Sequence, residues 1–140
     1  MAAHIYKKSN ANVVGVTLSE EQIAYAQQRK IREKLEKVEY RLQDYRNVNE
    51  KYDRIVSVGM FEHVGTAHYQ EFFNKVYDLL NDSGVALIHT IGRLNEPGNT
   101  DPWIDKYIFP GGYIPALSET VSRVEKSGLS LTDVQVLRFH

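Results

Sequence analysis

The chain has 140 residues, of which 42% are hydrophobic and 25% are charged, and its formal net charge is −1. This length is sufficient for one domain with its own core, and the balanced charge gives no general electrostatic basis for binding nucleic acid. The absence of cysteine excludes disulfide bonds and thiolate metal sites and is typical of the reducing cytoplasm. No apolar segment is long enough to span a membrane. We therefore expect one cytoplasmic domain over residues 1–140.

The first fifty residues alternate between helix and strand patterns. Ser19-Glu20-Glu21-Gln22 has the form of a capping box, in which the serine hydroxyl accepts a backbone N–H three residues on and Gln22 reaches back. The helix that starts there carries basic residues in its last turns, which suit the negative end of the helix dipole. The elements predicted here are a short helix over residues 2–8, a strand over 13–17, a helix from 19 to about 35 and a strand over 38–42.

The rest of the chain is organised around residues 52–65, which join an apolar run to an acid and a histidine. The apolar run, residues 55–58, is typical of a strand buried on both faces of a parallel sheet, and Gly59 ends that strand. The elements predicted next are a helix over 66–80 stopped at 82–84, a buried strand over 85–91, a polar loop over 92–102, an aromatic segment over 103–113, a helix from Ser118 to Gly128 and a strand over 131–139. This alternation predicts an α/β fold with a mostly parallel sheet.

Three polar groups follow predicted strands, where α/β sheets bind their ligands. They are Thr17 and Leu18 with Gln22, Asp44 with Tyr45, and residues 59–63 with Glu62 and His63. Each has a plainer interpretation. Gln22 can serve only the capping box, Asp44 can start a turn, and Glu62 can be an acid favoured at a helix N-terminus.

His89 lies near the end of the strand expected to neighbour the one before Glu62. A lone histidine in an apolar strand is more often a core residue, but in register Glu62 and His89 would share one cavity. Together they could hold a small polar group or a proton-accepting ion. A metal site lacks a third ligand with convincing spacing. The aromatic residues 103–113 could cover an apolar substrate or simply pack as a small cluster.

With these residues the chain resembles the cyclopropane-fatty-acyl-phospholipid synthases, a family of S-adenosylmethionine-dependent methyltransferases that includes the mycolic acid cyclopropane synthases. The runs that carry the resemblance are residues 14–19 with Gln22, 42–45, 53–65, 87–92, and 103–104 with 106–112. They extend over nearly the whole chain from Asn12 onward.

The resemblance implies that the cis double bond of an acyl chain attacks the sulfonium methyl of S-adenosylmethionine, after which a bound bicarbonate ion removes a proton and the ring closes. It assigns Glu62 and His89 to the bicarbonate, with His63 and the backbone of Val58 beside it. It places Thr17, Leu18 and Gln22 around the ribose and methionine portions of the cofactor, and Asp44 and Tyr45 around the adenine.

The resemblance also implies segments that this chain does not contain: a glycine-rich cofactor motif before Met1, an upstream substrate region with a cysteine, and a tyrosine beyond His140. We therefore expect the middle part of a longer enzyme, with a partial Rossmann-like sheet that lacks its first and last strands. Alone, it should have little or no activity. Its bare sheet edges should pair with another copy, giving a homo-oligomer, or the flanking strands should pair directly.

The expected reaction of the parent enzyme is methylene transfer to an unsaturated phospholipid acyl chain. Two alternatives stay open: a methyltransferase of the same family that acts on another small or lipid substrate, and a non-catalytic association module. Peripheral contact with the inner face of the membrane is a further open alternative, and no nucleic-acid partner is expected.

Overall fold

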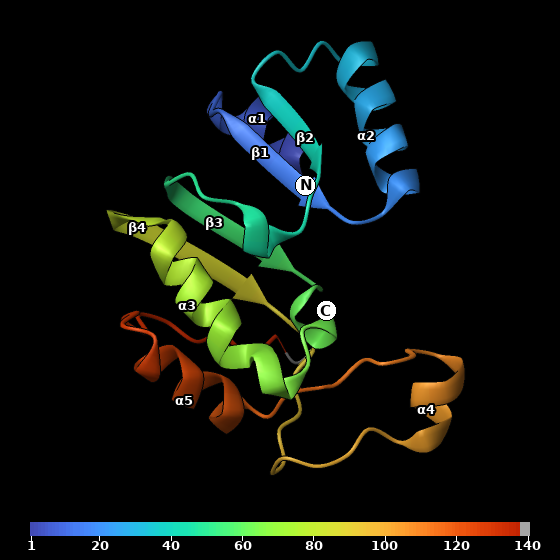
Figure 1. Ribbon diagram of the computed structural model, residues 1–140, viewed down its shortest axis with the longest axis vertical. Coiled ribbons are helices and arrows are strands. Elements are labelled where there is room, and N and C mark those ends of the chain that lie inside the picture. Colours follow the sequence, from blue (N-terminus) through green and yellow to red (C-terminus); the bar gives the residue numbers. More distant parts are fainter. Residues whose placement is uncertain (138–140) are drawn as a thin grey trace. The chain divides into compact units, whose positions relative to one another are not determined.

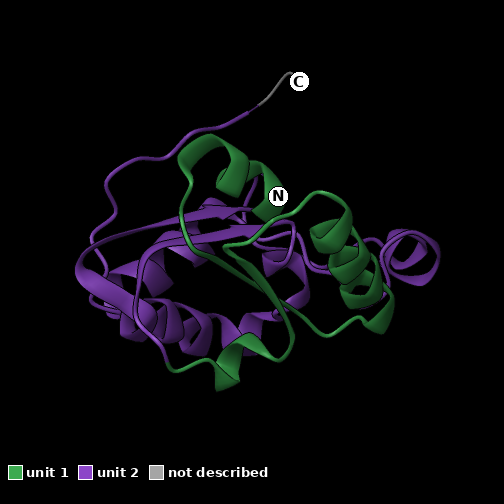
Figure 2. Cartoon of the chain, turned by 90° about the horizontal axis from the view of Figure 1, so that it is seen from above, with its two compact units in different colours: residues 1–49 green, residues 50–140 purple. Residues whose placement is uncertain are grey.

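The computed structural model describes residues 1–137 of the chain (Figure 1). The chain divides into two compact units, Met1–Asn49 and Glu50–His140 (Figure 2). Each unit has its own two-stranded parallel sheet. The expectation of one domain over residues 1–140 stays a prediction.

Unit 1 is a strand–helix–strand arrangement preceded by a short helix. Its strands pair in parallel, with Val13 opposite Val38 and Thr17 opposite Leu42. Ala3, Leu35 and Val38 form a small buried core. The elements are α1 (Ala2–Ser9), β1 (Val13–Thr17), α2 (Glu20–Arg32), β2 (Val38–Leu42) and the 3-10 turn η1 (Tyr45–Asn47).

Local sequence explains where the helices of unit 1 begin and end. Ser19 is the N-cap of α2, and its hydroxyl accepts the backbone N–H of Gln22 at 3.1 Å. Asn10 ends α1 in the left-handed conformation, which asparagine tolerates better than most residues. Both strands of unit 1 have the bounds that the sequence pattern predicts.

Unit 2 is built on β3 (Tyr52–Val58) and β4 (Leu80–His89), which also pair in parallel. From Arg54 opposite Val85 to Val58 opposite His89 the ladder is regular. Before that it is irregular, because Tyr52 pairs with Leu80 and Arg54 with Val85. Residues 82–84, expected to stop the helix before a strand over 85–91, are therefore a bulge within β4. Asn81 anchors this bulge by donating to the Asp53 carboxylate at 2.7 Å.

One helix packs on this sheet, and a second helix packs beside the first. α3 (Tyr69–Leu79) contacts β4, and α5 (Leu117–Lys126) packs beside α3 (Figure 1). The predicted helix over 66–80 is thus split into the 3-10 turn η3 (Thr66–His68) and α3. An aromatic core lies at the start of α3. The ring of Phe61, which is fully buried, is stacked on Tyr69 with 4.2 Å between ring centroids and also contacts Phe72 and Phe73.

The expectation that residues 55–58 are buried on both faces is wrong for the part of the chain that the structure describes. Val56 and Val58 are exposed, as are Val85 and Leu87 on the paired strand. Alternate residues of a strand lie on opposite faces, so these four side chains share one face. The apolar run is therefore only half covered, because α3 packs against the other face.

The C-terminal third differs most from the sequence-based expectation. A short helix, α4 (Pro102–Tyr107), occupies the start of the aromatic segment, and the Asp101 carboxylate caps it by accepting the N–H groups of Trp103 and Ile104. The cap of α5 is Ala116 and not Ser118. The predicted last strand over 131–139 is wrong for residues 131–137, which form no regular element, and its remainder lies outside the described residues.

The α/β class with parallel strands is confirmed. Within unit 1 β1 pairs with β2, and within unit 2 β3 pairs with β4. Direct pairing of the strands that would flank the missing central strand stays a prediction.

Replacing the buried Phe61 should cost more stability than replacing any exposed aromatic residue of unit 2. We expect Phe61→Ala to lower the free energy of unfolding by about 3–5 kcal/mol, because it leaves a cavity among three aromatic rings. Tyr107→Ala, at an exposed site on α4, should cost less than about 1 kcal/mol. Urea unfolding followed by circular dichroism measures both, and equal losses would contradict the proposed core.

A second prediction concerns acid stability in unit 1. Hydrogen bonds from Arg29 and Lys7 lower the pKa of Glu33 from 4.5 to about 2, and the Lys7 and Arg29 nitrogens lie 2.8 Å from its carboxylate oxygens. A lowered native pKa stabilises the fold fully above the unfolded value, and this contribution disappears as the pH falls from about 4.5 toward 2. Glu33→Gln should therefore flatten the dependence of unfolding free energy on pH in that interval, whereas Glu36→Gln, at an exposed neighbouring position, should leave it unchanged.

Candidate functional site

The turn that follows β3 places an acid at the end of the sheet. Gly59 has a φ of +64°, a left-handed conformation that L side chains rarely adopt, so the chain can leave the strand sharply there. The next residues form the 3-10 turn η2 (Phe61–His63). Phe61 enters the aromatic core and anchors the turn, and Glu62 follows it directly.

Glu62 is buried, with 1% of its surface exposed. Its carboxylate Oε1 accepts the backbone N–H of Ile91 at 2.7 Å, and its carbonyl oxygen accepts the backbone N–H of Tyr113 at 2.9 Å. The residue is thus bonded to both the start and the end of the long segment between β4 and α5.

The second carboxylate oxygen of Glu62, Oε2, is also buried and has no hydrogen-bond partner within residues 1–137. Glu62 forms no ion pair there either. A buried polar group without a partner costs free energy and is rare in folded proteins. The arrangement therefore suits a ligand that donates a hydrogen bond to Oε2.

His89 is the last residue of β4 and pairs with Val58 across the ladder. Its backbone carbonyl accepts the N–H of Gly59 at 3.1 Å. His89 is exposed, and within the described chain its ring makes no hydrogen bond to Glu62. The expected parallel register of the two strands is confirmed. The Glu62 carboxylate accepts its hydrogen bond from Ile91, two residues after His89, so both residues lie at the same end of β4.

His63 and Val58 are also placed at this end of the sheet. The His63 ring lies against Phe109, with 4.5 Å between centroids, so this exposed histidine contacts the aromatic segment. Val58 is 48% exposed and shares a sheet face with His89. The backbone of Gly112 packs closely against Phe109, because a Cβ atom at this position would meet the Phe109 ring.

Three residues support Glu62: Arg93 and Glu119, which sequence reasoning missed, and Tyr113, which it considered only as part of an aromatic cover or cluster. Tyr113 donates its hydroxyl to both Glu119 carboxylate oxygens at 3.0 Å. The Arg93 guanidinium lies over the Tyr113 ring, 5.4 Å from its centroid, and donates from Nε to the Ile114 carbonyl at 2.8 Å. The one signal that could have identified Glu119 is its place three residues after the helix cap, the position of a capping-box acid.

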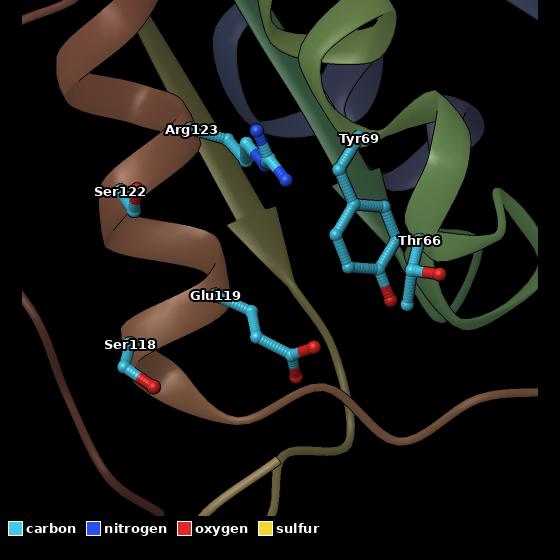
Figure 3. Close-up of a pocket in the computed structure, with 6 residues that line it drawn as sticks. All are labelled: Thr66, Tyr69, Ser118, Glu119, Ser122 and Arg123. Atoms are coloured by element: carbon cyan, nitrogen blue, oxygen red, sulfur yellow. The ribbon is translucent and has the colours of Figure 1, made fainter. Parts of the chain in front are cut away.

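A cavity of about 250 Å³ lies between α5 and the start of α3 (Figure 3). Tyr69 lines it and is 1% exposed, and its hydroxyl has no hydrogen-bond partner within the described chain. Burial, followed by the charges of Glu119, Tyr113 and Glu62, raises the pKa of Tyr69. The hydroxyl therefore stays protonated at neutral pH and is available as a donor. The other lining residues are Thr66, Ser118, Glu119, Ser122 and Arg123.

In unit 1, the residues after β1 form a small hydrogen-bonded group. The Thr17 hydroxyl donates to the Gln22 side-chain oxygen at 2.8 Å and accepts the Ser19 backbone N–H at 3.1 Å. Gln22 is therefore not the capping-box partner that the sequence suggested, because Thr17 takes the backbone N–H that Gln22 would have accepted. Leu18, between them, is 70% exposed.

Asp44 and Tyr45 follow β2. Asp44 caps η1 by accepting the Arg46 backbone N–H at 2.9 Å, and its other oxygen lies 2.6 Å from the Arg46 guanidinium. These contacts hold the pKa of Asp44 below its usual value. The turn interpretation of Asp44 is thus confirmed, and the carboxylate stays charged beside the first residue of η1, Tyr45.

No three acidic or histidine side chains of residues 1–137 are placed to hold a metal ion together. Over the same residues, no helix is both long and apolar enough to cross a membrane.

The whole chain, residues 1–140, matches the family model described as mycolic acid cyclopropane synthetase. It is 46% identical over 125 residues to cyclopropane-fatty-acyl-phospholipid synthase of Escherichia coli K12, an alignment that covers 89% of this chain and 32% of that protein. It is 34% identical over 153 residues to methoxy mycolic acid synthase MmaA3 of Mycobacterium tuberculosis, covering 96% of this chain and 50% of that one.

Among solved structures, the chain is similar to mycolic acid cyclopropane synthase CmaA1 complexed with SAH and CTAB. The TM-score is 0.84 at 34% identity, over 95% of this chain and 52% of that one. The chain thus spans between a third and about half of the length of these relatives.

The burial of Glu62 without an ion pair predicts an unusual stability series. Glu62→Gln should equal the parent or exceed its free energy of unfolding by about 1 kcal/mol, because glutamine keeps the oxygen that accepts from Ile91 and removes a buried charge. Glu62→Ala should lose about 1–3 kcal/mol, since the Ile91 N–H is then left without a partner. Chemical unfolding at pH 7 measures the series, and a glutamine variant as unstable as the alanine variant would refute this account.

Proposed function

Because this chain belongs to the mycolic acid cyclopropane synthetase family, we propose that it is the part of a lipid cyclopropane synthase that holds the catalytic base and much of the cofactor site. The reaction would transfer a methylene group from S-adenosylmethionine to the cis double bond of an unsaturated phospholipid acyl chain. The observation that carries the proposal is the buried Glu62 carboxylate, with one oxygen bonded to Ile91 and the other without a partner.

Glu62 fits a bicarbonate ion. The ion carries one O–H donor, and Oε2 of Glu62 is a buried acceptor without a donor in the described chain. Bound bicarbonate would supply the base for the last proton transfer. We propose that Glu62 accepts its O–H and so orients it, and that His89 and His63 supply donors from the exposed side. The backbone of Val58, next to Gly59, would lie beside the ion.

The cofactor residues also fit their proposed ligand. Bound S-adenosylmethionine would supply the electrophilic methyl group. The Gln22 amide keeps its NH₂ donor free of the Thr17 bond and can donate to a carboxylate or a ribose hydroxyl. Thr17 orients Gln22, and the exposed Leu18 offers an apolar contact beside it. In this proposal the charged Asp44 accepts from the adenine amino group and the Tyr45 ring lies near the base.

An acyl substrate is supported by the aromatic segment. Trp103, Tyr107 and Ile108 are about 60% exposed in the described chain, which leaves an apolar surface beside the Phe109 ring that contacts His63. Exposed aromatic residues of this kind mark lipid or protein contacts. In this proposal the protein works in the cytoplasm, touches the inner face of the membrane to reach its substrate, and forms homo-oligomers through its sheet edges.

The proposal is tested by Glu62→Gln and His89→Ala in the longest natural polypeptide that contains this chain. We expect each to slow cyclopropane formation from unsaturated phospholipid vesicles by about 10²–10⁴-fold, the usual contribution of a positioned general base. The affinity for S-adenosylmethionine, measured by calorimetry, should stay within about twofold of the parent, because neither residue is assigned to the cofactor.

Two matched replacements control for the loss of an acid or a histidine. Glu71→Gln and His68→Ala change an exposed pair, bonded at 3.1 Å, that has no role in the proposal. Both should keep parental turnover. Full turnover by Glu62→Gln would remove that residue from the base site, and a methylated product without a ring would instead support a methyltransferase that acts on another lipid.

A further inference from the structure

The turn that carries Glu62 depends on a residue more than fifty positions away. η2 is only three residues long, so contacts outside the turn determine the direction of its carbonyl and carboxyl groups. Two such contacts are present: the Ile91 N–H donates to the carboxylate at 2.7 Å, and the Tyr113 N–H donates to the carbonyl oxygen at 2.9 Å. The position of Tyr113 therefore affects Glu62 directly.

Tyr113 is itself held by side chains. Its hydroxyl donates to the two carboxylate oxygens of Glu119 at 3.0 Å each, and the Arg93 guanidinium covers its ring. Hydrogen bonds to a charged acceptor are roughly twice as strong as those between neutral groups. Burial, together with the bond to Glu119, raises the pKa of Tyr113, so the hydroxyl remains a donor at neutral pH.

Glu119 is fixed by the helix that carries it. Its Oε2 accepts the N–H of Ala116, the cap of α5, at 2.9 Å. In Figure 3 the Glu119 side chain extends from α5 toward Tyr69, across the cavity between the two helices. The two ends of the segment between β4 and α5 are also joined directly, because the backbone N–H of Arg93 donates to the Pro115 carbonyl at 2.9 Å.

We propose that Glu119 is a positioning residue for Glu62, acting through the hydroxyl and the backbone N–H of Tyr113. The inference rests on the proposed function, because it assumes that the orientation of Glu62 matters for turnover. Loss of the Glu119–Tyr113 bond frees the Tyr113 side chain and loosens the bond to the Glu62 carbonyl. A small displacement of a catalytic group is enough to slow a reaction strongly.

The test is a double-mutant cycle with Tyr113→Phe, Glu119→Gln and the combined variant, made in the longest natural polypeptide that contains this chain. Tyr113→Phe removes only the hydroxyl and keeps the backbone donor to Glu62. Glu119→Gln also weakens the Ala116 contact, because one amide oxygen cannot replace two carboxylate oxygens. The matched control is Glu125→Gln, at an exposed position on the same helix.

We expect each single variant to lower kcat by about tenfold, with the KM for S-adenosylmethionine unchanged. The combined variant should be no slower than Glu119→Gln alone, because Tyr113→Phe removes a bond that Glu119→Gln has already broken. Amide hydrogen exchange provides a readout independent of activity: the N–H groups of Tyr113 and Ile91 should exchange about tenfold faster in Glu119→Gln and at the parental rate in Glu125→Gln.

Independent, additive losses in the cycle would overturn the proposal, as would parental exchange at both amides in Glu119→Gln. Failure of the proposed function is distinguishable from this outcome. If Glu62→Gln keeps full turnover while the two amides still exchange faster in Glu119→Gln, the coupling of Glu119 to Glu62 is correct and the assigned role of Glu62 is wrong.

Discussion

The rest of unit 2 is arranged around the hydrogen bond that the Ile91 N–H donates to the Glu62 carboxylate. This bond holds an acid in a buried position at the end of β3 and ties to it the first residues after β4. Burying a carboxylate is unfavourable unless its oxygens are satisfied, and here only one of them is. The Phe61 ring, fixed among three other aromatic rings, keeps the turn in place despite this cost.

The supporting residues converge on this acid from distant parts of the chain. Tyr113 binds the backbone of Glu62, and Arg93 binds the segment that follows Tyr113. The segment between β4 and α5 is therefore anchored at both ends, while α4, in its middle, exposes Trp103 and Tyr107. In the proposed function, this acid holds the base and the exposed aromatic surface contacts the lipid chain.

Much of the fold could be predicted because its signals are local. The alternation at residues 38–42 and the serine cap before α2 depend on neighbouring residues alone. The strand has the expected bounds, and the helix starts at the expected cap. The strand end at Gly59 and the register of Val58 with His89 also follow from local pattern and parallel pairing. Glu62 could be selected because it follows the end of an apolar strand, and His89 because it interrupts one.

The remaining features depend on contacts that no local pattern encodes. The bulge before Val85 arises because β4 begins directly after α3, which leaves Asn81 to bond to Asp53 across the ladder. Gln22 does not complete the predicted capping box, because the Thr17 hydroxyl accepts the Ser19 N–H in its place and donates to the Gln22 side chain. Residues 131–137 have a strand-like pattern but no paired strand, and a strand without a ladder is not stable. Tyr113 and Glu119 act through tertiary bonds across the loop.

The short ladder of unit 1 has a consequence for synthesis on the ribosome. Val13 pairs with Val38, and the entire β1–α2–β2 unit lies within Met1–Asn49. Proteins are made from the N-terminus at about 5–20 residues per second. All the partners of this ladder are therefore available a few seconds before His89, the last residue of the second ladder, is translated. The order of assembly is thus set by chain position: the nascent protein can complete the segment assigned to the cofactor before the segment assigned to the base exists.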